Sequence, residues 1–378
     1  MTPTHLSLFC GCGGFTAGLK AAGFETLLAL DLDPVCLASH RLNHPEAAAA
    51  QADLGAVDAV GLAGLLVREG LASRPVTLAT MGPPCEPFSG ASPRKKADRE
   101  GDHRRGLYRP AVELAAALGA ELVLVENTSK IRDYPEAVRI LDALAAAGYR
   151  NQLAGVLDAA DHGVPQKRRR WFALAARDGG VRLRWPRPTT EGRPVTVREA
   201  FAGLPPEAGD HPEGCVSGYA ALMRDHAFWR LAAPHGLTHH EAPGQTPAMR
   251  MRRTLVRPGG RAKDLRRSLA AGTAEALTGC RVLPRRDFGQ RDYRLRWDAP
   301  ANTVTAHVAE EFIAPQGGRP VTAREAARLQ SFADAYRWAG RLTGPGNAGI
   351  QSVYAQIGDS VPPLLAYRLG LTIKEMLT

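Results

Sequence analysis

The chain has 378 residues, of which 44% are hydrophobic and 23% are charged, so it is long enough to bury a sizeable core in one to three domains. It contains no apolar run approaching the roughly 20 residues that a bilayer requires, and no basic-then-apolar signal pattern at its start, which excludes a membrane-spanning protein and favours the cytoplasm. A formal charge of +10 and a sequence pI of about 9.6 fit a polyanionic partner such as nucleic acid. Charge alone does not decide this, because many basic proteins bind no nucleic acid.

Taken in chain order, the first half alternates short apolar runs with helical stretches. We expect strands at residues 5–9, 24–30, 76–81, 122–125, 155–159 and 170–176, and helices at 13–22, 110–118 and 135–147. The continuous apolar runs at 76–81 and 122–125 are typical of buried parallel strands. Strands that alternate with helices predict a doubly wound α/β sheet.

The pattern changes near Trp185, where proline, glycine and arginine begin to interrupt the chain and periodicity becomes weak. Between Met249 and Trp297 the only acids are Asp264, Glu275, Asp287 and Asp292. The same stretch holds the basic residues Arg250, Arg252, Arg253, Arg257, Arg261, Lys263, Arg266, Arg267, Arg281, Arg285, Arg286, Arg291, Arg294 and Arg296. So long a one-signed bias predicts a basic surface for a polyanion. Helices are expected again at 322–332 and 362–377.

The six cysteines give no sign of a metal site or a disulfide framework. They are Cys10, Cys12, Cys36, Cys85, Cys215 and Cys280, and none forms a CxxC pair. Reduced thiols in a cytosolic compartment are the simplest interpretation, and we expect no metal cofactor.

A glycine-rich loop follows the first predicted strand and opens the first predicted helix. Its residues are Phe9, Cys10, Gly11, Cys12, Gly13, Gly14 and Phe15. Glycines at such a turn let the backbone approach a ligand closely at a helix N-terminus. Asp31 follows at the interval expected for an acid that binds ribose hydroxyls, and Asp53 lies near the end of the next unit. These features predict a nucleoside site. A nicotinamide oxidoreductase is the competing interpretation, although the GxGxxG pattern is absent, and a purely structural glycine turn is the simplest one.

A cysteine flanked by prolines follows the predicted strand 76–81. The segment reads Gly82-Pro83-Pro84-Cys85-Glu86-Pro87-Phe88-Ser89. Open α/β sheets bind their ligands at the carboxyl ends of their strands, and prolines stiffen a loop that positions a nucleophile. Thiolate is strongly nucleophilic near neutral pH. A lone cysteine is more often structural, but this setting favours Cys85 as a nucleophile.

Two further polar segments adjoin predicted strands. Glu126 and Asn127 end the strand at 122–125, where a carboxyl with a raised pKa is able to donate a proton. Gln166-Lys167-Arg168-Arg169-Arg170 leads into the strand at 170–176. Because alternate residues of a strand share one face, Arg168 and Arg170 are expected to point at one target, such as phosphate or a base carbonyl. Either segment alone is also compatible with an ordinary solvated surface.

In this order, the segments resemble the DNA (cytosine-5-)-methyltransferase family of bacterial and phage restriction-modification systems. The glycine loop is similar to the family's cofactor motif, Gly82–Cys85 to its Pro-Cys loop, Glu126-Asn127 to its Glu-Asn pair, and Gln166-x-Arg168-x-Arg170 to its Gln-x-Arg-x-Arg motif. Residues 324–332 resemble the helix that organises the target recognition domain, and 356–363 the motif that completes the cofactor pocket. The whole ordered set is a far stronger signal than any one motif.

Three positions depart from the family pattern. Glu86 stands where glutamine is usual, Thr128 where valine is common, and Asp359 where asparagine is frequent. The two acids add negative charge near DNA phosphates and cofactor, but neither replaces a residue of the chemical step.

The resemblance implies a Rossmann-like S-adenosylmethionine-dependent methyltransferase fold with a second, smaller and irregular target recognition domain. The catalytic domain would be 1–185 completed by 346–378, and the recognition domain 186–345. It implies methyl transfer from S-adenosylmethionine, which becomes S-adenosylhomocysteine, to carbon 5 of a cytosine flipped out of duplex DNA, through a covalent bond between Cys85 and carbon 6.

The resemblance assigns residues to three roles. Catalysis would use Cys85, Glu126, Arg168 and Arg170, with Arg170 on the cytosine O2 and Arg168 steadying Glu126 or the backbone. Cofactor binding would use Phe9, Cys10, Gly11, Cys12, Gly13, Gly14, Asp31, Leu32, Asp53, Leu54, Pro84, Leu107, Asp359 and Ser360. DNA binding would use Ser89, Gln166, Arg250, Arg252, Arg253, Arg285 and Arg286.

Two alternatives stay open at this point. One is an RNA cytosine C5-methyltransferase of the same fold, against which the large basic middle argues. The other is a catalytically dead DNA-binding regulator, against which the intact Cys85, Glu126, Arg168 and Arg170 argue. A monomer is the expected state. Neither the recognition sequence nor the existence of a separately encoded cognate endonuclease follows from the sequence.

Overall fold

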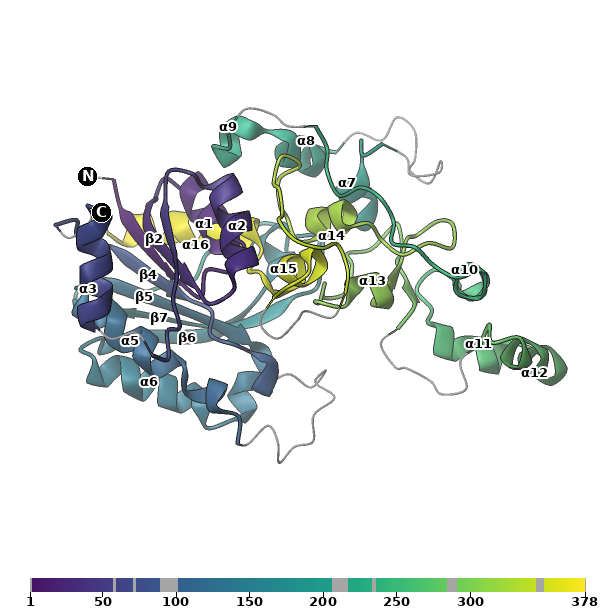
Figure 1. Cartoon of the computed structure of the whole chain (residues 1–378), viewed down its shortest axis with the longest axis horizontal. Coiled ribbons are helices and arrows are strands. Elements are labelled where there is room, and N and C mark those ends of the chain that lie inside the picture. The colour runs from purple at the N-terminus through teal and green to yellow at the C-terminus, as the bar shows by residue number, and fades with distance from the viewer. Residues whose placement is uncertain are drawn as a thin grey trace.

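The computed structural model describes residues 2–56, 59–70, 73–88, 101–205, 217–232, 236–283, 291–344 and 350–377. A central β-sheet with helices on both faces forms one part of the molecule, and a set of short helices extends from it on one side (Figure 1). None of the helices in these ranges is long and apolar enough to cross a membrane.

The sheet has seven strands in the order β3-β2-β1-β4-β5-β7-β6. Their bounds are β1 Thr4–Leu8, β2 Glu25–Asp31, β3 Ala48–Gln51, β4 Leu78–Met81, β5 Leu122–Thr128, β6 Asn151–Asp158 and β7 Arg169–Ala176. The first five strands are mutually parallel, whereas β7 runs antiparallel to both β5 and β6. The predicted α/β sheet is therefore confirmed, and the reversed β7 was not foreseen.

Alternate residues of the central strands enter different cores because successive side chains of a strand point to opposite faces. Leu122 and Leu124 of β5 join a core with α1 (Gly14–Ala21) and α16 (Pro363–Met376). Val123 and Val125 join a second core with α5 (Tyr108–Ala117) and α6 (Glu136–Ala146). Each helix pair covers one face of the sheet (Figure 1). Helices α2 (Pro34–Asn43) and α3 (Ala59–Arg68) complete this half.

The C-terminal helix is built into the N-terminal half of the chain. A Cβ atom added to Gly18 of α1 would collide with the carbonyl oxygen of Pro363, the first residue of α16. The two helices approach this closely because glycine has no side chain at the crossing. The end of the chain is thereby held beside the first strand and the loop that follows it.

The middle of the chain contains more regular structure than its weak periodicity predicted. Its helices are α7 Val197–Phe201, α8 Gly218–Arg224, α9 His226–Trp229, α10 Pro247–Leu255, α11 Ala262–Ser268, α12 Ala271–Gly279, α13 Val308–Glu311, α14 Ala323–Leu329 and α15 Val353–Asp359. Two short strands, β8 (Tyr293–Arg294) and β9 (Phe312–Ile313), pair in parallel. Helices α10 to α12 lie farthest from the sheet (Figure 1).

The apolar cores divide the molecule differently from the predicted domain boundaries. Val256, Leu265 and Ile313 belong to a small separate core around α10 to α12. Phe201 and Phe332, by contrast, share the main core with Phe172 of β7. The main core therefore crosses the boundary expected at residue 185, and the division into 1–185, 186–345 and 346–378 stays a prediction.

Candidate active site

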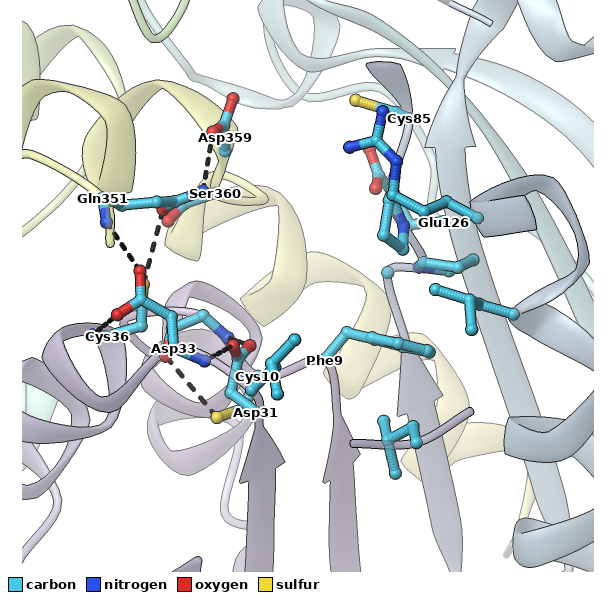
Figure 2. Close-up of a pocket in the computed structure, with 18 of the residues that line it drawn as sticks. Phe9, Cys10, Asp31, Asp33, Cys36, Cys85, Glu126, Gln351, Asp359 and Ser360 are labelled. Carbon is cyan, nitrogen blue, oxygen red and sulfur yellow. Dashed lines mark hydrogen bonds between the residues drawn. The ribbon is translucent and has the colours of Figure 1, made fainter. Parts of the chain in front are cut away.

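A cavity of about 500 Å³ opens at the carboxyl ends of β1, β2, β4 and β5 (Figure 2). Of the predicted cofactor residues, those that line it are Phe9, Cys10, Gly11, Gly14, Asp31, Leu32, Asp53, Leu54, Pro84, Leu107, Asp359 and Ser360. Cys85 and Glu126 line the same cavity. The predicted nucleoside site and the predicted nucleophile thus share one cavity.

The glycine loop is held by the carboxylate of Asp31. Gly11 N–H donates to Asp31 Oδ2 at 2.7 Å, and Asp33 N–H donates to Asp31 Oδ1 at 2.9 Å. Burial raises the pKa of Asp31. A Cβ added to Gly14 would collide with the carbonyl oxygen of Val361, so the loop packs directly against the backbone of the C-terminal motif.

Cys12 and Gly13 support the loop without lining the cavity. Cys12 Sγ lies 3.2 Å from Ser360 Oγ, and Tyr336 donates its hydroxyl to the Cys12 carbonyl at 2.5 Å. Gly13 has a φ of 100°, and a Cβ there would lie 2.7 Å from the Tyr336 hydroxyl and 3.0 Å from the His40 ring. Glycine is required at this position both by its backbone conformation and by the lack of space.

The far end of the cavity suits an adenosine. Asp53 Oδ1 accepts from Gly55 N–H at 2.8 Å, which fixes the turn after β3. Leu54 is buried, and Leu107 packs against Gly55, where a Cβ would lie 2.9 Å from its side chain. Asp31 and Asp53 offer acceptors for hydroxyl and amino groups, and the leucines offer apolar contact for a flat ring. These donor and acceptor types fit the nucleoside part of S-adenosylmethionine.

Gln351 and Asp33 join the C-terminal motif to the cavity wall, a contribution that sequence reasoning missed. Gln351 N–H donates to Asp33 Oδ2 at 2.6 Å, while Asp33 Oδ1 caps α2. The Gln351 side-chain amide donates to Asp359 Oδ2 at 3.0 Å (Figure 2). Gln351 lies 318 positions from Asp33 and 8 positions from Asp359 in the sequence. No local sequence pattern indicates the contact with Asp33.

Cys85 lies directly after β4, on a loop that is tied to the neighbouring strand. Asn127 of β5 donates its side-chain amide to the Pro83 carbonyl at 3.2 Å. Burial, followed by the charges of Asp359, Glu86 and Glu126, raises the pKa of the Cys85 thiol to about 12, against the opposing effect of Arg170. The thiol is therefore neutral in the free protein, and its ionisation requires a change of surroundings.

Glu126, which lines the same cavity as Cys85, forms an ion pair with Arg170. Arg170 Nε lies 3.1 Å from Glu126 Oε1, and the antiparallel pairing of β5 with β7 brings the two side chains together. Burial raises the pKa of Glu126, against the opposing effect of Arg170 and Arg168. Such a carboxyl is suited to hold or donate a proton near neutral pH.

Arg168 does not point with Arg170 at a common target, which corrects the prediction for this pair. Its guanidinium donates to the carbonyl oxygens of Val304 at 2.7 Å, Gly358 at 2.7 Å and Ser360 at 2.9 Å. The side chain is 1% exposed. Arg168 thus ties β7 to the C-terminal motif that lines the cavity, and acts on the site through the backbone.

Gln166 and Arg253 are also placed differently from the prediction that they contact DNA. Gln166 is fully buried, and its side chain bonds to Leu329, Gln330 and Val304. Arg253 is 3% exposed and donates to Asp292 at 2.7 Å. Both side chains are committed to internal contacts, so neither offers a free surface to DNA.

The remaining predicted DNA contacts divide into three cases. Arg250 of α10 is exposed. Arg252 is partly buried and pairs with Asp292 at 2.7 Å. Ser89, Arg285 and Arg286 lie outside the described residues.

Glu86, the first departure from the family pattern, faces a cation across the cavity. Arg104 Nη1 lies 3.4 Å from Glu86 Oε1, and Asp102 holds the same guanidinium with a second contact at 2.7 Å. Both Glu86 and Arg104 line the cavity. Arg104 was not predicted, because the segment before it carries no motif that places it beside the nucleophile.

Comparison with known proteins identifies the family. The family model described as "C-5 cytosine-specific DNA methylase" matches residues 4–375. The chain belongs to this family. It is 30% identical to the Type II methyltransferase M.AgeI of Thalassovita gelatinovora, with 98% of each chain covered. It is 29% identical to the Type II methyltransferase M.DdeI of Desulfomicrobium norvegicum, over 97% of this chain and 87% of that protein.

Solved structures agree on the fold. A structure described as a DNA modification methyltransferase encoded within a prophage of E. coli superposes with a TM-score of 0.72 over 99% of both chains, at 20% identity. The Dnmt2 methyltransferase of S. pombe gives 0.56, at 17% identity. The chain therefore has the Rossmann-like fold of S-adenosylmethionine-dependent methyltransferases, and it is a DNA cytosine-5 methyltransferase that uses S-adenosylmethionine.

Proposed function

We propose that this enzyme flips a cytosine out of a specific duplex DNA sequence and methylates it through a covalent bond between Cys85 Sγ and carbon 6. The observation that carries the proposal is the shared cavity. Cys85 follows β4, Glu126 lies near the end of the adjacent parallel strand β5, and both line one cavity with the predicted cofactor residues. A base inside a stacked duplex has no access to such a space, so it must leave the stack at a cost of a few kcal/mol.

The chemistry begins at the nucleophile. The Cys85 thiol gives up its proton to solvent, and the thiolate adds to carbon 6 of the cytosine while the protonated Glu126 donates its proton to N3, which neutralises the charge developing on the ring and leaves Glu126 as a carboxylate. Arg170, which already pairs with Glu126 at 3.1 Å, would also donate to the O2 oxygen. Carbon 5, now electron-rich, takes the methyl group that S-adenosylmethionine supplies. A base from solvent then removes the proton on carbon 5, the electron pair of that bond re-forms the C5–C6 double bond and expels the Cys85 thiolate, and N3 returns its proton to Glu126.

Other residues position the reactants. Asp31, Asp53 and Leu107 would hold the nucleoside of the cofactor, in keeping with their acceptors and apolar surface in the cavity. Arg168 would act as a positioning residue, because its three carbonyl contacts fix the C-terminal motif next to the strand that carries Arg170. The described residues contain no cluster suited to a metal ion, and the proposed steps use none.

The exposed arginines of the basic segment, such as Arg250, would bind DNA phosphates. We expect the part of the chain around α10 to α12 to contribute to target recognition. A separately encoded restriction endonuclease and a monomeric state remain predictions, the first of them prompted by relatives named as Type II methyltransferases.

The decisive experiment incubates the protein with labelled S-adenosylmethionine and duplex DNA of mixed sequence, followed by sequencing for 5-methylcytosine. Parallel reactions contain duplex DNA with 5-fluorocytosine, which blocks release of the enzyme because the proton on carbon 5 is absent. We expect methylation in one short context and a protein–DNA adduct that survives denaturation.

Two variants separate the roles. Cys85→Ser should form no adduct, and its rate of methylation should fall more than a thousandfold. Glu126→Gln should methylate at least a hundredfold more slowly and should still bind the cofactor. Methylation of DNA by the Cys85→Ser protein would refute the covalent route. Transfer to RNA and not to duplex DNA would overturn the assignment of the substrate.

A further inference from the structure

Asp359 is placed at the end of the cavity where the methyl group must be transferred. In Figure 2 it faces Cys85 across the cavity, while Phe9, Cys10 and Asp31 line the opposite end. The methyl group has to lie between the cofactor and carbon 5, the neighbour of the carbon that would bond to Cys85. A charge at Asp359 therefore acts near the sulfur of the cofactor.

Asp359 differs from the other acids at this end because it has no cationic contact. Glu126 pairs with Arg170 at 3.1 Å, and Glu86 pairs with Arg104 at 3.4 Å. Among the described residues, Asp359 receives one hydrogen bond, from the neutral amide of Gln351, and no lysine, arginine or histidine lies within ion-pair distance of it. Its second oxygen is left open to the cavity.

A carboxylate at this position is unfavourable for the nucleophile. Asp359 raises the pKa of the Cys85 thiol more than any other charged neighbour. Burial and Glu86 in turn raise the pKa of Asp359 to about 6, while Arg168, Arg170 and His307 act in the opposite direction. The acid is thus mostly ionised at pH 8, where it disfavours the Cys85 thiolate.

We propose that Asp359 gives this enzyme a preference for the sulfonium cosubstrate over its thioether product. S-adenosylmethionine carries a positive charge on sulfur, and S-adenosylhomocysteine carries none, whereas the rest of the two molecules is the same. Asp359 lines the cavity and its side chain is exposed, so its carboxylate attracts the sulfonium through a water-screened field and gains little from the neutral thioether. The inference rests on the proposed function only for the position of the cofactor in this cavity.

The consequence is faster exchange of product for cosubstrate. In most binding contacts the two molecules are equivalent, so a neutral site would leave the product to compete with its precursor. The positive charge on the cofactor sulfur is lost when the methyl group is transferred. The attraction to Asp359 is therefore lost for the product, which binds more weakly than the cosubstrate. Asp359 is therefore a specificity-determining residue, and an asparagine in its place would keep the shape and remove the discrimination.

Binding of the two molecules to the Asp359→Asn variant and the wild-type protein, measured by titration calorimetry at pH 8, tests the proposal. We expect the ratio of the dissociation constant for S-adenosylhomocysteine to that for S-adenosylmethionine to fall about tenfold in Asp359→Asn, equivalent to about 1.4 kcal/mol. Asp359→Glu keeps the charge and should keep most of the ratio. An analogue of S-adenosylmethionine in which a dimethylammonium nitrogen replaces the methylsulfonium sulfur keeps the positive charge and both remaining chains, and it should behave like S-adenosylmethionine.

Asp53→Asn is the matched control, since it removes the same charge at the adenosine end of the cavity. This variant should weaken the binding of S-adenosylmethionine and S-adenosylhomocysteine equally, and the ratio of their dissociation constants should stay unchanged. A change of less than twofold in Asp359→Asn, or an equal change in Asp53→Asn, would overturn the proposal. If Asp359→Asn is unstable, Asp359→Ser and the ammonium analogue on the wild-type protein provide the same comparison. Repeating the titrations in Cys85→Ser separates this result from the covalent mechanism, because binding does not need the thiol.

Discussion

At the scale of single residues, Cys85, the proposed nucleophile, lies among charged groups that act on its thiol pKa in opposite directions. Burial raises the pKa of Cys85 to about 12, so the free enzyme holds a neutral thiol. Arg170 is the charged neighbour that favours the thiolate, and it already pairs with Glu126. A protonated or substrate-bound Glu126 would leave Arg170 free to act on the thiol and the base. Activation is thereby linked to the arrival of the cytosine.

Glu86→Gln should tighten DNA binding about two- to fivefold at low salt, because the exposed carboxylate next to Cys85 repels phosphates and is only partly neutralised by Arg104 at 3.4 Å. The gain should exceed this range in an Arg104→Ala background, where nothing offsets Glu86, and should vanish at high salt. Fluorescence anisotropy with a short duplex measures both effects. Glu121→Gln removes an exposed acid at the opposite end of β5 and should change nothing. Equal gains in the two variants would mean that only net charge matters.

Residues of the site divided sharply between those that local sequence predicts and those that it does not. Cys85, Glu126 and Asp31 lie at strand ends, and strands are visible as apolar runs, so their convergence on one edge was predictable. Gln351 was not, because its contact with Asp33 joins segments 318 positions apart, and Arg104 was not, because no sequence motif places it beside Glu86. The burial of Gln166 was equally hidden, since a polar side chain in a basic pentamer is normally solvated.

At the scale of elements, a buried layer of polar rings supports the glycine loop from behind. His44 Nε2 lies 3.1 Å from the Tyr336 hydroxyl, and the His40 and His44 rings are 4.9 Å apart. His40 Nε2 lies 3.1 Å from the Thr16 hydroxyl in α1. Burial lowers the pKa of His40 to about 4 and that of His44 well below its ordinary value. The loop therefore rests on neutral histidines.

These histidines should make the protein sensitive to acid. Their folded-state pKa values lie below the unfolded value of about 6.5, so the unfolded chain binds more protons below that pH and the folded state loses stability as the pH falls. Each histidine contributes up to about 1.4 kcal/mol per pH unit, down to a pH near 4 for His40. The acids with raised pKa values, such as Asp31 and Asp359, act in the opposite direction.

The effect of His40 is tested by measuring the free energy of unfolding of the wild type and of His40→Asn in urea at pH 7.5, 6.5 and 5.5. The stability advantage of the wild type should shrink as the pH falls, because only the wild type must keep that ring neutral. His307→Gln, which changes an exposed histidine, should give a constant difference. A constant difference for His40→Asn as well would show that the ring is charged or solvated.

Most strands of the sheet followed their sequence signals, although β3 (Ala48–Gln51) was not predicted, and in the irregular half the helix predicted at 322–332 is present as α14 (Ala323–Leu329) while the other short helices were not predicted. The strand predicted at 122–125 is part of Leu122–Thr128, and the helix predicted at 362–377 is Pro363–Met376. The direction of β7 was not predictable, because an apolar run reads the same in both directions. Short helices such as α11 bury only Ala262 and Leu265 and leave no periodic stripe to detect.

At the scale of the whole molecule, the arginines of the basic segment between Met249 and Trp297 fall into two groups, one buried in internal contacts and one exposed. Arg294 is buried, and its guanidinium donates to the carbonyl oxygens of Arg253 and Val256 at 2.6 Å, at the C-terminal end of α10. Arg252 and Arg253 share the carboxylate of Asp292. Part of the positive charge that suggested a polyanion partner therefore stabilises the segment itself. The exposed cations that remain include Arg250, Arg257 and Arg267.

This division predicts opposite phenotypes for two arginines of the same helix. Arg250→Ala should weaken DNA binding at low salt and reduce the slope of log affinity against log salt by about one, because one phosphate contact is lost. Arg253→Met should leave that slope unchanged and lower the melting temperature, because it removes a buried partner of Asp292. Anisotropy titrations at four salt concentrations and thermal unfolding measure the two effects. If Arg253→Met alone changed the slope, the buried arginine would have to reach DNA through a rearrangement of α10, and the assignment of the DNA surface to its exposed residues would be wrong.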